Sequence, residues 1–167
     1  SEHPQLILDA LPVLETMLRD RSTSEQRATL DVVLTLAQTD PEYVTPLSDI
    51  LLEFVEQRSH PIPSSAAIGY LAKARPDVAV AAIPTFADWT TQEDPQIRSN
   101  GLGVLADLAE TYPEKVLPYA DRAHELLADD DTYARYNATS VLARIVRVAP
   151  GVVDPAAERL QELLTTD

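Results

Sequence analysis

The chain has 167 residues, 45% of them apolar, with 27 acidic and 13 basic side chains and a net charge of −14. A surface this acidic cannot present the basic stripe that phosphates require, so we expect binding neither to nucleic acid nor to an anionic membrane. The absence of cysteine excludes disulfides and thiolate metal sites, and no apolar run is long enough to cross a membrane.

Five prolines recur at intervals of 35 to 37 residues and mark an internal repeat. These marker prolines are Pro4, Pro41, Pro76, Pro113 and Pro150. Proline lacks a backbone N–H, so it is tolerated where a helix begins and excluded from the helix interior. A period of this length is typical of stacked two-helix units, none of which can bury its apolar face alone.

The apolar pattern around the markers predicts nine helices. Val33, Leu36 and Ala37 stand eight, five and four residues before Pro41, and apolar residues occupy the same positions before the later markers. This spacing follows one face of an α-helix. We call the helix after each marker the A helix and the helix before the next marker the B helix. The expected A helices cover 5–20, 42–57, 77–90, 114–128 and 151–165, and the expected B helices cover 23–39, 61–74, 95–111 and 132–148.

Additional prolines predict irregular A helices. Three of them stand five residues after a marker, which predicts a separate turn before the main A helix; they are Pro46, Pro118 and Pro155. Pro12 and Pro84 stand eight residues after a marker, inside an A helix, and are expected to kink it.

The second repeat differs from the others at the start of its B helix. Pro61 and Pro63 remove two backbone donors there. We expect this B helix to be the shortest of the four, with the stack distorted nearby.

The third and fourth B helices open with related segments, Asp94-Pro95-Gln96-Ile97-Arg98 and Asp131-Thr132-Tyr133-Ala134-Arg135, each followed by an Ala/Leu-rich face. These segments are similar to those of HEAT repeats. The resemblance implies an all-α fold: a right-handed α-α superhelix, or solenoid, of about four and a half HEAT-like helical hairpins, forming one domain over 1–167. It also implies that B helices line the concave side. In that family such Asp and Arg residues hold neighbouring repeats together, which gives Asp94, Arg98, Asp131 and Arg135 a structural role.

No pattern in the sequence indicates catalysis. There is no Gly-x-Ser-x-Gly segment and no phosphate-binding Gly-rich loop. His3, His60 and His124 are isolated and lack metal-ligand spacing. The run Asp129-Asp130-Asp131 lacks the alternate oxygens of a calcium loop and is interpreted as a solvated turn with an N-cap. We therefore expect no enzyme activity, no cofactor and no metal.

The leading interpretation is a protein–protein interaction scaffold that grips a protein or peptide on the concave B-helix surface. Its candidate partner-binding residues are Arg27, Tyr70, Lys73, Tyr136, Arg144 and Arg147. Arg144 and Arg147 form a rare basic spot that could accept an acidic segment; the alternative is two arginines on a solvated face. Two other functions remain open: a structural spacer or oligomerisation module of a larger protein, and a lyase-like accessory protein that handles a cofactor. The partner and the oligomeric state are undetermined.

The charge admits two explanations. Only Lys73 and Lys115 are lysines, and an acidic, lysine-poor surface resembles the proteins of extreme halophiles, where salt screens crowded carboxylates. The other explanation is a basic partner. The absence of cysteine is compatible with a reducing compartment, and we expect a cytoplasmic protein.

We predict that salt stabilises the fold. The Debye length falls from about 30 Å at 0.01 M to about 3 Å at 1 M, which weakens repulsion among the excess carboxylates. The midpoint of a thermal melt followed by circular dichroism should therefore rise substantially between dilute buffer and 2 M KCl. Neutralising Asp129 and Asp130 to asparagine should reduce that dependence, whereas an unchanged midpoint would contradict the halophile interpretation.

Overall fold

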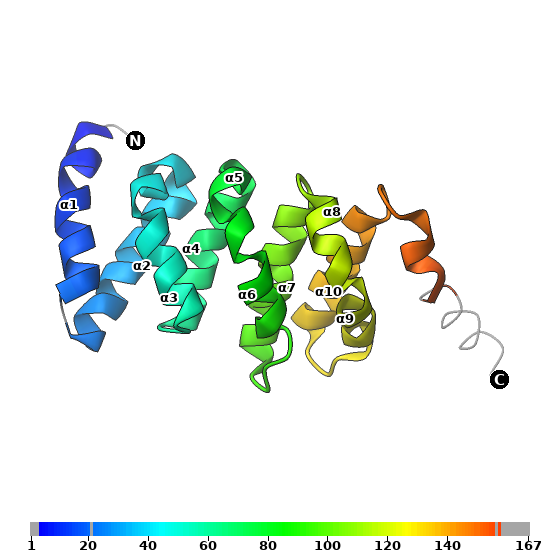
Figure 1. Ribbon diagram of the computed structural model, residues 1–167. Coiled ribbons are helices and arrows are strands. Elements are labelled where there is room, and N and C mark those ends of the chain that lie inside the picture. The colour runs from blue at the N-terminus through cyan, green and yellow to red at the C-terminus, as the bar shows by residue number, and fades with distance from the viewer. Residues whose placement is uncertain (1–3, 21, 156, 158–167) are drawn as a thin grey trace. The chain divides into compact units, whose positions relative to one another are not determined.

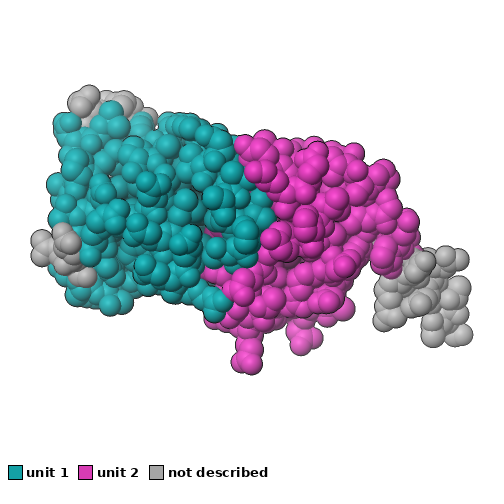
Figure 2. Space-filling view, in the orientation of Figure 1, with its two compact units in different colours: residues 1–85 teal, residues 86–167 magenta. Residues whose placement is uncertain are grey.

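The computed structural model describes residues 4–20, 22–155 and 157. Throughout these ranges every regular element is helical, with no β-strand. The chain divides into two compact units, residues 1–85 and 86–167 (Figure 2). The expectation of a single domain stays a prediction.

Unit 1 consists of helical hairpins that pack on one another (Figure 1). Helix α1 packs against α2, and α4 packs against both α2 and α3. The elements in chain order are α1 (Pro4–Asp20), α2 (Thr23–Thr39), η1 (Pro41–Leu47), α3 (Ser48–Glu56), α4 (Pro61–Ala74), α5 (Pro76–Ala79) and η2 (Val80–Ala82), followed by α6 (Ile83–Trp89), which runs across the boundary into unit 2.

Unit 2 repeats the same plan (Figure 1). Its elements are α7 (Pro95–Ala109), α8 (Pro113–Val116), η3 (Leu117–Tyr119), α9 (Ala120–Glu125), η4 (Leu126–Ala128), α10 (Thr132–Ile145) and η5 (Pro150–Val153). Helix α10 packs against α7 and α9.

The alternation of A and B helices is confirmed in the described part of the chain. The B helices are α2, α4, α7 and α10, and each marker proline lies between a B helix and the next A helix or begins the first one. The first two B helices have the expected bounds, whereas the last two end a few residues early, at Ala109 and Ile145. The last A helix begins with η5, and the rest of its expected range lies outside the described residues.

Prolines divide the interior A helices as expected. Pro46 lies in η1, before α3, and Pro118 lies in η3, before α9. Pro84 occupies the first turn of α6, directly after the break at η2. A helix tolerates proline in its first turn because the N–H there has no intrahelical acceptor. Pro12 differs, because α1 continues through it without interruption.

Large aromatic side chains of the A helices lie in the core. Trp89 and Phe86 are fully buried, and Phe54 is almost fully buried. The rings of Phe86 and Trp89 meet edge to face, with centroids 5.3 Å apart. A Cβ added at Gly101 would lie 2.7 Å from the Phe86 carbonyl oxygen, so this glycine allows α7 to approach α6.

The second B helix corrects the sequence prediction. Helix α4 has 14 residues, the same number as α10, so these two B helices are equally short and α4 is not the single shortest. Pro61 begins it, where no donor is needed. The irregularity lies in the preceding turn, because Arg58 (φ 52°) and His60 (φ 46°) adopt left-handed backbone conformations. No side-chain hydrogen bond caps the start of α4.

This turn generates a prediction. A side chain in the left-handed region costs about 1–2 kcal/mol, whereas glycine adopts that region freely but loses more entropy on folding. Arg58→Gly should therefore raise the free energy of unfolding by about 0.5 kcal/mol, measured by urea denaturation.

The matched control is Gln57→Gly in the same turn. Gln57 has an ordinary φ of −78°, so glycine there should lower stability. Equal destabilisation by both substitutions would show that the turn stores no backbone strain.

Candidate functional site

The candidate partner-binding residues of unit 1 are all engaged within the chain. The Arg27 Nε lies 3.3 Å from Asp31 Oδ1, one turn along α2. The Lys73 ammonium lies 5.8 Å from the centre of the half-buried Tyr70 ring, within cation–π range. Arg27 and Lys73 both keep their side chains exposed, so these pairs form the outer surface of α2 and α4.

In unit 2, Arg144 and Arg147 hold the end of α7. Arg147 Nη1 lies 2.9 Å from Glu110 Oε1, and Arg144 Nε lies 3.1 Å from Glu110 Oε2. Arg147 also donates to the Glu110 carbonyl and to that of Ala109, the last residue of α7. Cations are favourable at this end of a helix, because the terminal carbonyls there lack intrahelical donors. Arg147, with Arg144, holds the pKa of Glu110 below its ordinary value.

These contacts bear on the two interpretations of Arg144 and Arg147 left open by the sequence. Arg144 and Arg147 already have an acidic partner in Glu110. The alternative, two arginines on a solvated face, describes them better, because Arg147 remains about half exposed while it makes these contacts.

Two tyrosines stand out on the surface of α10. Tyr136 is 70% exposed and Tyr133 is 73% exposed. Residues three apart lie on the same side of a helix, so the two phenol rings form one exposed aromatic patch, here called the tyrosine pair. The sequence analysis singled out Tyr136 but missed Tyr133. The three-residue spacing from Tyr136 was the signal that could have found it.

A hydrogen bond from Asn137 and the small residue Gly103 allow α10 to pack closely against α7. The Asn137 side chain donates to the Ser99 carbonyl oxygen at 2.8 Å. A Cβ added at Gly103 would lie 3.3 Å from the Asn137 amide nitrogen, which leaves little room for a larger residue. On the neighbouring side of α10, Ala138 and Val141 are fully or almost fully buried. The tyrosine pair therefore projects from a helix fixed on two sides.

Arg98 joins two successive repeats of unit 2. Its guanidinium forms a bidentate pair with Asp129, with Nε–Oδ2 at 2.9 Å and Nη2–Oδ1 at 3.0 Å. The same guanidinium donates to the carbonyls of Gln92 and Glu93. Only 7% of the Asp129 side chain is exposed, and Arg98 holds the pKa of that carboxyl below its ordinary value. One arginine thus fixes its own turn and the next one.

The Asp and Arg residues of the two repeated segments contact backbone groups at the starts of their helices. Asp94 accepts from Gln96 N and Asp131 accepts from Ala134 N, each at 2.8 Å, so both act as N-caps. Arg135 donates to the carbonyls of Asp129 and Asp130 in the turn before its helix. Arg98 and Arg135 therefore hold equivalent turns.

The turns before α7 and α10 carry three exposed carboxylates: Glu93, Asp94 and Asp130. The arginine contacts bring the turns that carry them together at the start of α7 and α10. Tyr133 lies in the first turn of α10, three residues after Asp130.

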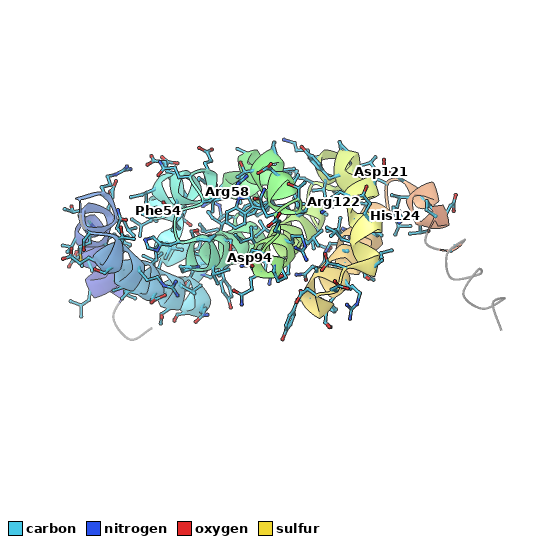
Figure 3. The ribbon with its side chains drawn as sticks, turned by 90° about the horizontal axis from the view of Figure 1, so that it is seen from below. Phe54, Arg58, Asp94, Asp121, Arg122 and His124 are labelled. Carbon is cyan, nitrogen blue, oxygen red and sulfur yellow. The ribbon has the colours of Figure 1, made fainter. Side chains whose placement is uncertain are left out.

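Two further side chains tie neighbouring elements together from α9, where Figure 3 labels them. Arg122 donates to the Thr90 carbonyl through Nε and Nη2, and Arg122 Nη1 pairs with Glu125 at 2.6 Å. His124 Nε2 contacts the Val152 carbonyl oxygen. His124 thus has a structural partner, and no group of three metal-ligating side chains occurs in the described part of the chain.

Unit 1 contains a hollow of about 280 Å³ between α1, α2 and α3. Five of its eight lining residues are polar or charged; the eight are Leu18, Arg19, Gln26, Ile50, Glu53, Phe54, Gln57 and Ser59. Arg19 and Glu53 pair at 3.3 Å, and the strained Arg58 follows Phe54 closely along the chain (Figure 3). A cofactor-handling protein requires an apolar pocket, and this lining does not provide one.

The described helices include none that is both long and apolar enough to span a membrane.

The Arg98–Asp129 pair generates a prediction. Asp129→Asn should lower the free energy of unfolding by about 1.5–3 kcal/mol at neutral pH, because it leaves a half-enclosed guanidinium without its charged acceptor. The contribution of Asp129 is present above its unfolded pKa and is lost as the pH falls through its lower folded pKa. The difference between wild type and variant in urea denaturation should therefore shrink below about pH 4.

Asp130→Asn is the matched control, since Asp130 is exposed one residue away. It should have little effect on stability at any pH. Asp130→Asn alone is also the better neutralising substitution for the salt experiment, because changing Asp129 breaks an ion pair as well as removing charge. A pH-independent loss in Asp129→Asn would exclude an ionic contribution.

Comparisons with known proteins give similarity in fold alone. No protein-family model matches the chain, and no curated protein matches it either. An engineered protein of known structure is 18% identical, with a TM-score of 0.80, over 99% of this chain and 76% of its own. A designed armadillo repeat protein, solved in complex with the peptide (KR)4, is 15% identical, with a TM-score of 0.71, over 81% of this chain and 64% of its own.

A third similar structure is Kap95p, whose binding induces the switch loops of RanGDP to adopt the GTP-bound conformation. It is 18% identical, with a TM-score of 0.65, and the match covers 97% of this chain but only 23% of Kap95p. The chain is therefore an all-α protein with the helical-repeat, solenoid-type fold that the sequence predicted.

Proposed function

We propose that this chain is a non-catalytic scaffold that binds a positively charged segment of another protein on the solvent-exposed face of the B helix α10. The tyrosine pair, Tyr133 and Tyr136, is the contact surface. The single observation that carries the proposal is the exposure of both rings, 73% and 70%, on one side of a well-fixed helix.

Exposed tyrosines suit this role physically. Tyrosine offers a large apolar face with few rotatable bonds, so ordering it on a partner costs little entropy. The face of the ring also attracts lysine and arginine, worth about 0.5–1 kcal/mol for each exposed cation–π contact.

The surrounding charge favours a cationic partner. Glu93, Asp94 and Asp130 are exposed in the turns before α7 and α10, while Arg98 and Arg135 are engaged within those turns. The net charge of −14 would also steer a basic segment toward the chain. An acidic segment would meet repulsion instead.

The similar structures support this choice without specifying it. The designed armadillo repeat protein is in complex with a peptide of alternating lysine and arginine, and Kap95p is bound to another protein. Both are helical-repeat proteins whose partners are proteins or peptides. We include in the proposal a cytoplasmic, salt-rich setting, which rests on the composition alone.

The test is binding of a fluorescently labelled (KR)4 peptide, followed by anisotropy in 0.1 M KCl. The double variant Tyr133→Ala/Tyr136→Ala should weaken binding about tenfold, as the loss of two exposed cation–π contacts implies. Tyr119→Ala serves as the aromatic control, because Tyr119 lies in η3, in the A-helix layer, and should leave the affinity unchanged.

An acidic (EE)4 peptide should not bind. The proposal would be wrong if (KR)4 failed to bind the wild-type chain, or if the tyrosine variant bound it as tightly as the wild type. Circular dichroism of each variant establishes that the comparison is between folded proteins.

A further inference from the structure

The hollow in unit 1 corresponds to a place in unit 2 that an arginine side chain fills. The two places can be compared because positions counted from the marker prolines match between repeats. Ile50 stands nine residues after its marker, and Arg122 stands nine residues after the marker of its own repeat. The residues that line the hollow therefore have counterparts in unit 2, and the contacts of those counterparts show which chemistry this place accommodates.

In unit 2, the side chain of Arg122 (Figure 3) joins α9 to the turn after α6. Its Nε and Nη2 donate to the Thr90 carbonyl oxygen at 3.2 and 2.6 Å. Its Nη1 pairs with Glu125 at 2.6 Å. The planar guanidinium presents its N–H groups as a rigid fork, so one cation serves a backbone carbonyl and a carboxylate at once.

The corresponding place in unit 1 keeps both acceptors but has no arginine at the matching position. The Leu18 carbonyl corresponds to the Thr90 carbonyl, because each residue stands fourteen positions after a marker. The Glu53 carboxylate corresponds to that of Glu125, because each residue stands twelve positions after a marker. The donor is missing, because an isoleucine stands where unit 2 has its arginine.

Two further residues of the lining carry no charge, unlike their counterparts in unit 2. Gln26 stands fifteen residues before the next marker, as Arg98 does. Gln57 stands sixteen residues after its marker, as Asp129 does. Gln26 Nε2 donates to the Leu18 carbonyl oxygen at 2.7 Å, so it satisfies this acceptor without bringing a cation. The guanidinium groups that occupy unit 2 thus have no equivalent inside the hollow.

The cation of the hollow is already committed. Among the described residues that line it, Arg19 is the only cation, and it pairs with Glu15 at 3.2 Å and with Glu53 at 3.3 Å. The side chains of Arg19 and Glu53 are 43% and 51% exposed, so this pair lies toward solvent and leaves the hollow open. The buried part of the lining is apolar and consists of Leu18, Ile50 and Phe54.

We propose that the hollow binds one arginine side chain of another protein. The guest guanidinium pairs with the Glu53 carboxylate, as Arg122 pairs with Glu125 in unit 2. Its methylene stem lies along the apolar part of the lining, as the stems of long cationic side chains do on apolar surfaces. The volume of about 280 Å³ is just below that of ordinary ligand pockets, which begin at about 300 Å³, so it suits a single side chain.

Other guests fit the lining less well. The ammonium group of lysine cannot reproduce the planar fork by which a guanidinium serves two acceptors. A carboxylate would meet repulsion from Glu53 and Glu15, which outnumber the single arginine between them. A wholly apolar guest would cover these polar groups without giving them hydrogen bonds, which is costly.

The test is a titration of the full chain with N-acetylarginine amide in 0.1 M KCl, followed by amide NMR spectroscopy. We expect saturable shifts of the amide signals of Leu18, Gln26 and Ser59, which line the hollow. N-acetylcitrulline amide has nearly the same shape without the charge and should give no saturable shift. N-acetyllysine amide should bind more weakly than the arginine compound.

A matched pair of variants tests the role of Glu53. Glu53→Gln should raise the dissociation constant of N-acetylarginine amide about tenfold, as the loss of a charge-assisted hydrogen bond implies. Glu56→Gln is the control, because Glu56 is exposed on the same helix but does not line the hollow. It removes the same charge and should leave the affinity unchanged.

Ile50→Arg tests the correspondence with Arg122. The new guanidinium should occupy the hollow and abolish binding, in a variant whose circular dichroism shows it to be folded. If this variant does not fold, the comparison of Glu53→Gln with Glu56→Gln still decides the matter. The double variant Tyr133→Ala/Tyr136→Ala should bind N-acetylarginine amide as the wild type does, so this site can succeed or fail independently of the tyrosine pair.

Three outcomes would overturn the proposal. The first is no saturable shift in the wild-type chain, which would mean that the hollow holds only water. The second is equal affinity of the Glu53→Gln and Glu56→Gln variants, which would reduce the effect to net charge. The third is binding of the citrulline or lysine compound as tightly as the arginine compound, which would exclude recognition of a guanidinium.

Discussion

The burial of side chains between successive helical hairpins is the interaction on which the rest of the structure depends. A single hairpin cannot enclose its own apolar face, so residues such as Val33, Leu71 and Ile145, all fully buried, are excluded from water only through packing of one helix on its neighbours. The prolines then determine where each interior A helix is interrupted. They divide the interior A helices into short turns and a main segment, while the B helices between them remain continuous.

Arginine side chains also hold successive helices together, through contacts at the turns and helix ends. The guanidinium of Arg98 satisfies two backbone carbonyls of its own turn and both oxygens of Asp129. Arg147 binds the carbonyls that end α7, together with the carboxylate of Glu110. Both contacts join helix ends, where backbone groups lack intrahelical partners, so they fix the register of α10 on α7. The surface that carries the tyrosine pair is positioned by these polar contacts as well as by the core.

The parts that could be predicted from the sequence are those that depend on period. Leu71 and Trp89 follow from apolar spacing, and the turns before α3 and α9 follow from the chemistry of proline. The partner of Arg98 could not be predicted in this way, because Asp129 is 31 residues distant and its meeting with Arg98 depends on side-chain directions in two turns. The left-handed backbone conformation of Arg58 could not be predicted from the sequence either, because the turn contains neither a glycine nor an asparagine, the residues that commonly adopt it.

The arginine contacts also bear on the meaning of the composition. Of the 13 basic residues only Lys73 and Lys115 are lysines, a bias that salt adaptation would explain. The structure supplies a second cause, since an ammonium group cannot reproduce the planar fork with which Arg98 holds a carboxylate and two carbonyls at once. Arg122 likewise binds one carbonyl through two nitrogens and a carboxylate through a third. Among the described cations, Arg98, Arg122 and Arg147 join neighbouring elements in this way. Much of the negative charge is therefore left facing solvent.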